Sequence, residues 1–371
     1  MEQNIFFTSI DRASGTIIGY QVGKDWVPIQ VWKIRIAQAE NEKVHQVRSQ
    51  HQTASDVDHQ HHLPTSFVGD NLIYKYLDSN LFSISTFNSD SNTLTVYIIN
   101  GVSGKIVYKF QESNVTPGEP IDMYLSENFF VLAFKRSSTS YGALPQQEIS
   151  VTEFFQSREE SDTVKMLKDF YINKAERLIQ KKFSSFELES PVVIQESYLL
   201  TVDVKKIALT QSTRHVTSKM LVVITSNDQI YSIENALYTA RRQHKSEAEA
   251  IKQRELDEAT TLGPIKEKNE TEKLLDVKST LFPPYDGVIP QKNTRFISHD
   301  VHLVDLKSIY TMATRLESTT TVLAIGHDIF GARINPEGNF DRLHENFDAK
   351  FLFGSIIFLI IAVQAAQIYV K

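Results

Sequence analysis

The densest group of residues that could do chemistry is a histidine-rich stretch. It contains His45, His51, His59, His61 and His62, with Asp56 and Asp58 between them. Imidazole and carboxylate groups could together hold a zinc or nickel ion. The last three histidines, however, lie in a polar segment whose spacing matches no closed metal site. We therefore favour a solvated loop and predict no metal and no other cofactor.

Motifs for catalysis are missing from the sequence. It contains no G-x-S-x-G, no G-x-x-x-x-G-K-[ST] and no H-E-x-x-H. Trp26 and Trp32, the two tryptophans, lie in a strand-like region where core packing explains them. The cofactor-stacking aromatics and cation ligands of a quinone-dependent dehydrogenase are not apparent. The chain has no cysteine, which excludes disulfides and thiolate chemistry. We expect no catalytic residue and no enzyme activity.

Two glutamines interrupt an otherwise apolar C-terminal segment, FLFGSIIFLIIAVQAAQIYV (351–370). A helix of about 20 residues rises about 30 Å, enough to cross the hydrocarbon core of a bilayer. The segment carries no charge, and we predict a single transmembrane helix at 348–371. Polar and small residues on one helix face favour packing against another helix in lipid, although Gln367 could instead lie at the headgroups. The predicted packing face consists of Gln364, Gln367, Ala362, Ala365 and Ala366.

Two sequons for N-linked glycosylation bear on the orientation of the chain. They begin at Asn114 and Asn269. Their use would place the body in the lumen and the C-terminus in the cytosol. The positive-inside rule favours the opposite orientation, although large domains cross the membrane largely regardless of flanking charge. The flanking basic residues are Arg333, Arg342 and Lys350 before the predicted helix and Lys371 after it.

Composition and pattern favour a mainly β fold. The chain has 371 residues, 41% of them hydrophobic, and a net charge of −6, without the concentrated basic face that a nucleic-acid partner requires. The stretches IDRASGTIIGY (10–20) and INGVSGKIVYK (99–109) both predict a strand, a tight turn with Gly15 or Gly104, and a second strand. Their separation fits two units of about 44 residues, the length of a propeller blade. We predict β-propeller blades, forming a partial propeller, followed by the single transmembrane helix.

Two segments interrupt the strand pattern and suggest a domain organisation. Residues 1–235 are predicted as propeller blades with an inserted amphipathic helix near 161–182. The basic face of that helix could lie on a membrane surface or pack against the sheets. Residues 236–282 are predicted as a charged linker. Residues 283–347 return to strands and complete the body before the helix at 348–371.

The order of these elements resembles a known family. The motifs that carry the resemblance, in family order, are IFFTSIDRASGTIIGYQV (5–22), VGDNLIYKYLDSNL (68–81), INGVSGKIVY (99–108), SENFFVLAF (126–134), EISVTEFF (148–155) and RLESTTTVLAIGHDIFGARINPEGNFD (315–341). The last is the most specific, through Leu316-Glu317-Ser318-Thr319 and Gly326-x-Asp328-Ile329-Phe330. In these motifs the chain resembles the C-terminal part of subunit 1 of the endoplasmic reticulum membrane protein complex.

This resemblance implies a function and a location. The chain would be a non-catalytic lumenal scaffold of that complex, supporting the insertion of client transmembrane helices into the bilayer. It would be a single-pass protein of the endoplasmic reticulum membrane, with its body lumenal and its C-terminus cytosolic. The implied partners are the other subunits, client transmembrane proteins and the lipid bilayer. The alternative is a tail-anchored propeller that acts as a membrane tether or receptor.

The chain departs from the family in length. Family members are longer and open with a signal peptide and a further propeller region, whereas the first residues here show neither the basic nor the apolar region of a signal peptide. We expect a fragment of a longer protein or a divergent short form.

Two signature residues have structural interpretations. Strand alternation puts Lys75 on the face opposite Tyr74 and Tyr76, toward solvent. Asp328 is predicted to form a turn.

Overall fold

Strands make up most of the chain that the structure describes. The computed structural model describes residues 5–23, 25–39, 41–50, 63–64, 72–73, 75–137, 144–155, 185–186, 190–214, 216–246, 248–249, 282–299, 301–341 and 348–370. For residues 63–64, 72–73, 349 and 364–370 it describes the backbone alone. The mainly β fold predicted from the sequence is confirmed.

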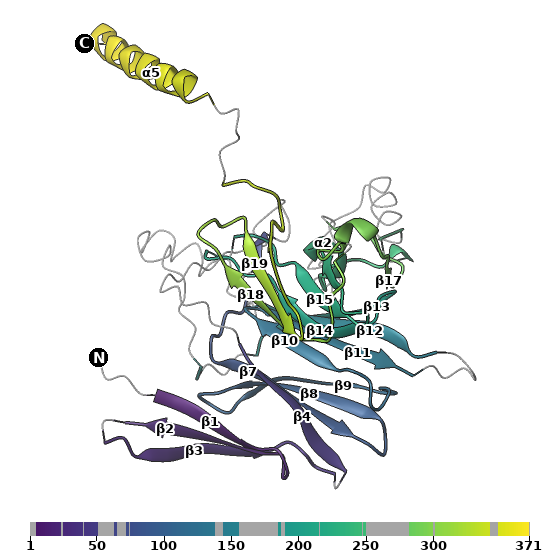
Figure 1. Cartoon of the computed structure of the whole chain (residues 1–371). Helices are drawn as coiled ribbons and strands as arrows, with labels where there is room; N and C mark the ends of the chain where they lie inside the picture. Colours follow the sequence, from purple (N-terminus) through teal and green to yellow (C-terminus); the bar gives the residue numbers. More distant parts are fainter. Residues whose placement is uncertain are drawn as a thin grey trace, which may run out of the picture.

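In this part of the chain, five sheets follow one another in sequence order (Figure 1). The first contains β1 (Ile5–Asp11), β2 (Thr16–Val22) and β3 (Pro28–Arg35). The second contains β4 (Glu42–Ser49), β7 (Leu81–Asn88), β8 (Thr93–Asn100) and β9 (Ile106–Glu112). The third contains β10 (Asp122–Ser126), β11 (Phe129–Arg136), β12 (Gln146–Phe155) and β13 (Val192–Leu200), with β17 (Val288–Ile289) parallel to β13.

The remaining sheets contain the later strands. The fourth sheet contains β14 (Val204–Leu209), β15 (Leu221–Thr225) and β16 (Ile230–Ile233). The fifth contains β18 (Leu306–Ala313), β19 (Thr320–Gly326) and β20 (Ile329–Ile334). A small ladder pairs β5 (Leu63–Pro64) with β6 (Leu72–Ile73). The short helices are α2 (Asn235–Tyr238) and the 3-10 turn η1 (Asn293–Arg295).

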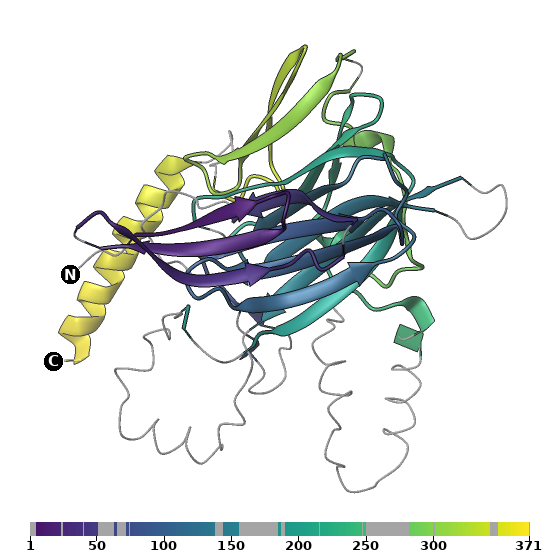
Figure 2. The ribbon, with the colours of Figure 1, turned by 90° about the horizontal axis from the view of Figure 1, so that it is seen from below.

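The sheets pack face to face, and one hydrophobic cluster fills each space between neighbours. Ile17 and Ile84 belong to the cluster between the first two sheets, and Val96 and Leu132 to the next one. A third cluster joins β11–β13 to β14–β16, and a fourth joins β14–β16 to β18 and β19. Successive antiparallel sheets stacked in this way are the arrangement of propeller blades. Seen from below, the β1–β3 sheet lies nearest the viewer, at one end of the stack (Figure 2).

Burial along the strands follows from this stacking. All five residues of β15, LVVIT, are buried, because sheets cover both of its faces. In contrast, β1 and β20 alternate between exposed and half-buried residues. Both belong to the sheets at the ends of the stack, where one face has no neighbouring sheet among the described residues. A strand of an inner sheet can therefore be buried along its whole length, as β15 is, whereas strands of the terminal sheets such as β1 and β20 alternate.

Two further predictions concern the segments that interrupt the strand pattern, near 161–182 and at 236–282. The amphipathic helix predicted near 161–182 lies outside the described residues. Within the predicted linker 236–282, residues 238–243 are buried. The Tyr238 hydroxyl donates a hydrogen bond to the carbonyl of Lys219 at 2.8 Å, so these residues pack on the body. The division into four domains otherwise stays a prediction.

A long helix, α5 (Ala349–Val370), ends the described chain. Its described side chains are largely exposed, including Phe351 at 76% and Phe358 at 71%. Figure 1 draws it away from the sheets. Among the described residues, no helix combines the length and apolarity needed to cross a membrane. The transmembrane helix predicted at 348–371 therefore stays a prediction.

Candidate functional site

A single carboxylate joins strands of three different sheets. Asp122 begins β10, and its side chain is only 1% exposed. Its Oδ1 accepts hydrogen bonds from Gln46 Nε2 at 2.7 Å and from Arg48 Nη2 at 3.0 Å, both on β4. Its Oδ2 accepts the backbone N–H of Ile207 on β14 at 2.9 Å. Because a buried carboxylate needs such partners, Asp122 ties the second, third and fourth sheets together.

A second aspartate makes the next connection along the stack. Asp228 lies in the turn between β15 and β16, with a φ of 58°. Its Oδ1 accepts the backbone N–H of Leu306 and the ammonium of Lys205, both at 3.0 Å. Its Oδ2 accepts the N–H of Asp305 at 2.9 Å. This carboxylate fastens the start of β18 to the fourth sheet.

The signature residue Glu317 joins the same two sheets at another point. Its carboxylate accepts the backbone N–H groups of Arg214 at 2.7 Å and Val216 at 2.8 Å. The Thr217 hydroxyl donates to the carbonyl of Glu317 at 2.7 Å. Burial raises the pKa of Glu317, but hydrogen bonds from Ser212 and these backbone groups outweigh it and leave the pKa below its usual value. Glu317 therefore acts as an ionised anchor for the segment between β14 and β15.

The neighbouring signature residue, Ser318, holds the segment that follows β20. Its hydroxyl donates to Asp341 Oδ1, and its backbone N–H donates to Asp341 Oδ2 at 3.2 Å. The hydrogen bond from the Ser318 side chain lowers the pKa of Asp341. The chain is thus fixed to the fifth sheet at Asp341, eight residues before α5 begins at Ala349.

The prediction that Lys75 faces solvent is wrong. Lys75 is 9% exposed, and its Nζ lies 3.5 Å from Glu127 Oε2. Lys219 Nζ approaches the other oxygen of Glu127 at 2.8 Å. Burial lowers the pKa of Lys75, and Glu127 opposes that effect. An isolated antiparallel bridge pairs Lys75 with Phe155, the last residue of β12, which lies between β11 and β13 in the third sheet. The lysine therefore packs on that sheet.

A further buried ion pair lies near this group. Arg241 and Glu153 are 3% and 1% exposed, and Arg241 Nε lies 3.0 Å from Glu153 Oε2. Glu153 also accepts the Thr239 hydroxyl and the N–H of Ala240, the latter at 2.9 Å. These contacts attach residues 239–241 to β12. They explain why part of the charged segment after β16 is folded onto the body.

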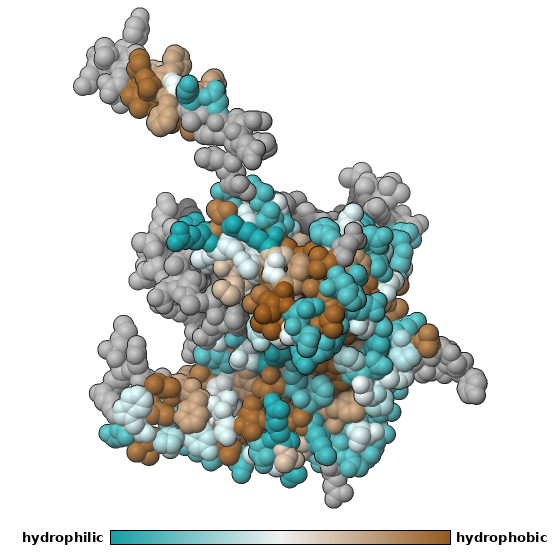
Figure 3. All heavy atoms as spheres, viewed as in Figure 1, coloured by the Kyte–Doolittle hydropathy of each residue, from teal (hydrophilic) through white to brown (hydrophobic). Residues whose placement is uncertain are grey.

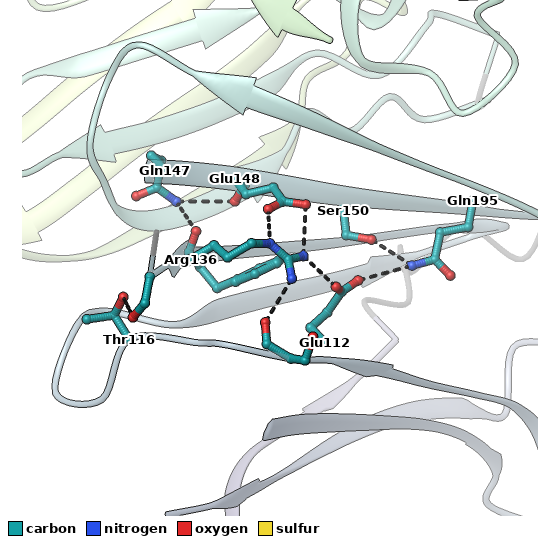
Figure 4. A network of polar contacts seen from close by, with 10 residues as sticks. Glu112, Thr116, Arg136, Gln147, Glu148, Ser150 and Gln195 are labelled. Atoms are coloured by element: carbon teal, nitrogen blue, oxygen red, sulfur yellow. Dashed lines mark hydrogen bonds and ion pairs between the residues drawn. The ribbon is translucent and has the colours of Figure 1, made fainter. Parts of the chain in front are cut away.

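A further connection between the second and third sheets is a network around Arg136 (Figure 4). Its Nε donates to Glu148 Oε2 at 2.6 Å, and its Nη2 donates to Glu112 Oε2 at 2.7 Å. Gln195 Nε2 donates to Ser150 Oγ at 2.8 Å. Glu148 raises the pKa of Arg136 above its ordinary value. Burial raises the pKa of Glu112, although its bond to Arg136 opposes this. The network connects β9 with β11, β12 and β13.

The signature Gly326-x-Asp328 has a steric and a polar role. A Cβ on Gly326 would lie 1.9 Å from the carbonyl oxygen of Asp305. Asp328 Oδ2 accepts the backbone N–H of Val304 at 2.8 Å. Glycine and aspartate thus allow residues 304–305 to pass against the β19–β20 turn. Asp328 takes part in that turn, and it also binds the segment that enters β18.

Of the two predicted glycosylation residues, Asn114 is described by the structure and Asn269 is not. Asn114 lies exposed between β9 and β10, with a φ of 56°. Its carbonyl accepts the N–H of Ser137 at 2.7 Å, and the Thr116 hydroxyl of the same sequon contacts Ser137 Oγ at 2.9 Å. Asn269 lies outside the described residues. Use of either sequon stays a prediction.

The other predicted residues lie partly outside the description. In α5, Ala362 is exposed, whereas for Gln364, Ala365, Ala366 and Gln367 only the backbone is described. Of the histidine-rich stretch, His45 lies exposed in β4, and the other four histidines are not described. No group of three or more potential metal-ligating side chains occurs among the residues that are described.

Sequence reasoning missed the aspartates that join the sheets. A signal was present at Asp122, because PIDMYL places an acidic residue at the start of an apolar strand. Its partners on β4 and β14 are far away in sequence, so the pattern alone could not identify them. The hydrogen bonds and ion pairs of the described polar clusters hold the sheets in fixed positions.

The stacked sheets and their polar connections define a β-propeller domain. A family model described as ER membrane protein complex subunit 1, second beta-propeller, matches residues 1–337. The chain belongs to the family of ER membrane protein complex subunit 1, as the resemblance indicated.

Relatives with that name occur in several organisms. The Gallus gallus protein is 24% identical over 377 residues, which cover 99% of this chain and 33% of the relative. The Xenopus laevis protein is 23% identical over 367 residues, covering 98% of this chain and 32% of the relative. The Saccharomyces cerevisiae protein is 24% identical over 362 residues, covering 96% and 41%. This chain therefore spans only about a third of the length of the two vertebrate relatives.

Proposed function

We propose that this protein is a non-catalytic scaffold subunit of the endoplasmic reticulum membrane protein complex, supporting the insertion of client transmembrane helices. The match of residues 1–337 to the family's second propeller is the observation that carries the proposal. The partners are the other subunits of the complex, client transmembrane proteins and the lipid bilayer. The body lies in the lumen, and one helix at 348–371 crosses the membrane to a cytosolic C-terminus.

The connections between the sheets support a scaffold role. A subunit that braces other proteins must keep its surfaces in fixed relative positions. Asp122, Asp228 and Glu317 each hold backbone or side-chain groups of a different sheet. Hydrogen bonds to charged groups contribute about 1.5–3 kcal/mol each, more than neutral ones. These residues therefore stabilise the arrangement of the blades rather than prepare a reacting group.

The exposed apolar surface of α5 supports the membrane anchor. Phe351, Phe353 and Phe358 are 66–76% exposed. Water would disfavour so many exposed aromatic side chains, whereas lipid or neighbouring helices would bury them. Figure 3 shows the described part of this helix as mainly hydrophobic. Gln364 and Gln367, with Ala362, Ala365 and Ala366, form the face that packs against the membrane subunits.

The experiment is purification of the tagged protein from its own membranes. The proposal predicts that multi-span membrane subunits of the complex co-purify with it in constant ratio. Gln364→Leu should reduce this recovery because the helix loses a polar contact, whereas the control Ile361→Leu should not. A glycosidase-sensitive mobility shift, lost on Asn114→Gln or Asn269→Gln, would establish the lumenal body. An unglycosylated, protease-accessible body without those subunits would refute the proposal and leave a tail-anchored tether or receptor.

A further inference from the structure

The inner strand of each blade occupies a regular place in the chain. In the second, third, fourth and fifth sheets, the first strand in sequence lies at one edge: β4, β10, β14 and β18. These four strands approach one another in succession, β4 to β10, β10 to β14, and β14 to β18. They also carry the connections made by Asp122 and by Thr311, whose hydroxyl donates to the carbonyl of Leu209 at 2.6 Å. The first strand of each of these sheets is therefore the innermost strand of a blade.

The first sheet departs from this rule. The chain enters the inner strand β4 directly from β3, just as it enters β10 from the outer strand β9 and β14 from β13. If the first sheet follows the same chain path, β3 is the outer strand of its blade. Counting inward, β2 is then the third strand and β1 the second strand from the propeller axis. In agreement, no close approach of the kind that joins the other inner strands is found between β1 and β4. The described first sheet thus lacks an innermost strand.

The edge of β1 has the properties of a site that can pair with a further strand. Among the described ladders, β1 pairs only with β2, in antiparallel register from Ile5 opposite Val22 to Asp11 opposite Thr16. Strand edges present unpaired N–H and C=O groups that readily pair with another chain. Ile5 and Phe7 of this edge strand are 51% and 44% exposed. Figure 3 shows apolar residues over this sheet, at the lower left of the view in Figure 1.

We propose that β1 accepts one further antiparallel strand, supplied by the region that directly precedes the matched segment in longer family members. In the other blades the inner strand precedes the second strand of the same sheet in the chain, so chain order selects this region. Longer family members have chain to supply it, because the family model that matches residues 1–337 describes their second propeller and this chain spans only 33% of the Gallus gallus protein. Adding a strand to an exposed edge is a common mode of binding for extended segments. The inference rests on strand order and is independent of the proposed function.

The residues of β1 specify what the added strand contains. Phe6, Thr8 and Ile10 are half-buried toward the second sheet, whereas Ile5 and Phe7 are exposed on the other face. Because Ile5, Phe6 and Phe7 place apolar side chains on both faces of β1, the part of the added strand that pairs with them should also be apolar on both faces. Toward Asp11, which is exposed, polar residues fit. This pattern distinguishes the expected strand from a generic surface loop.

A photo-crosslinking experiment tests the proposal in cells that express the native gene product. A benzophenone amino acid replaces Phe7 on β1, and a matched control replaces Lys33, which is exposed on the outer strand β3. We expect the Phe7 position to crosslink to a peptide from the region preceding the matched segment, and the Lys33 position not to. Phe7 crosslinks to a second copy, to another segment of residues 1–371, to lipid or to nothing would overturn the proposal.

Amide hydrogen exchange provides a second readout. Amides of β1 that do not bond to β2 should exchange at least about tenfold more slowly in the native product than in the recombinant 371-residue chain. Amides of the central strand β8 should be protected equally in both and so report that the recombinant chain is folded. Equal exchange of β1 in the two samples, with β8 protected in both, would show that no strand is added.

Discussion

At the scale of single residues, Asp122 shows how one charge determines the relation of three sheets. Its two oxygens have different tasks: Oδ1 receives side-chain donors from β4, and Oδ2 receives a backbone donor from β14. A neutral amide of the same shape cannot do both, because its NH₂ group would face either the N–H of Ile207 or the donors of Gln46 and Arg48. The charge therefore matters as well as the shape.

Asp122→Asn should lower the free energy of unfolding by about 2 kcal/mol, the typical value of charge-assisted hydrogen bonds whose partner groups become unpaired. Urea denaturation followed by tryptophan fluorescence measures this. Asp90→Asn is the matched control, since Asp90 is exposed and accepts a single bond from Asn41. Surface changes of that kind stay within about 0.5 kcal/mol. Equal effects of the two substitutions would contradict the role assigned to Asp122.

Glu317→Gln should lower stability by about 1–3 kcal/mol at pH 7, because one of two backbone N–H groups would face an NH₂ group. The pKa of Glu317 is lowered by folding. Its stabilising effect is therefore present above the carboxyl's unfolded pKa, about 4.3, and is lost as pH falls through the lower folded value.

The difference between wild type and Glu317→Gln should accordingly shrink when urea denaturation is repeated below about pH 4. Glu337→Gln, at an exposed glutamate, is the control and should show little difference at either pH. A gap between wild type and Glu317→Gln that is unchanged or larger in acid would mean that the carboxylate does not carry the contact.

At the scale of elements, the sheets depend on a few close approaches between connecting segments. Gly326 ends β19, where its Cα passes the backbone of Asp305 too closely for any side chain. Asp328 and Asp228 then hold residues 304–306 from two sides. The family motif Gly326-x-Asp328 therefore fixes the segment that leads into β18.

Gly326→Ala should cost about 2–4 kcal/mol or prevent folding, because the Cβ would meet a backbone atom that cannot move aside. Gly331→Ala, in the adjacent strand β20, offers the comparison. The nearest atom to its added Cβ would be Leu323 Cδ1 at 3.9 Å, an ordinary contact. Thermal unfolding of both variants measures the difference. A Gly326→Ala protein as stable as Gly331→Ala would exclude the steric role.

Some elements could be predicted from sequence because they depend on local pattern. The Ser-Gly turns at Gly15 and Gly104 join β1 to β2 and β8 to β9, and both glycines have positive φ, 64° and 73°. Lys75 could not be placed correctly, since its burial comes from Phe155, Glu127 and other residues far away in sequence. Strand alternation predicts which face a side chain takes, but not whether another segment covers that face.

At the scale of the whole molecule, the described sheets form a tightly connected stack whose two terminal faces are exposed. Four hydrophobic clusters and the polar connections unite the described sheets into one stack. The outer faces at both ends of that stack retain exposed apolar residues: Phe7 on β1, and Tyr310 and Met312 on β18 at 54% and 62%. Figure 3 shows apolar residues over both regions. A stiff body with apolar ends is suited to assembly with further blades or subunits.

The most direct measurement of the central claim is client insertion in cells depleted of this protein. A reporter transmembrane helix with a lumenal glycosylation site would be followed in membranes from depleted cells. We predict that reporter glycosylation falls on depletion and is restored by the wild-type gene product and by Asp90→Asn, but less well by Gly326→Ala at equal temperature. Insertion that is unchanged by depletion, while the depletion itself is verified, would contradict a role in supporting client insertion.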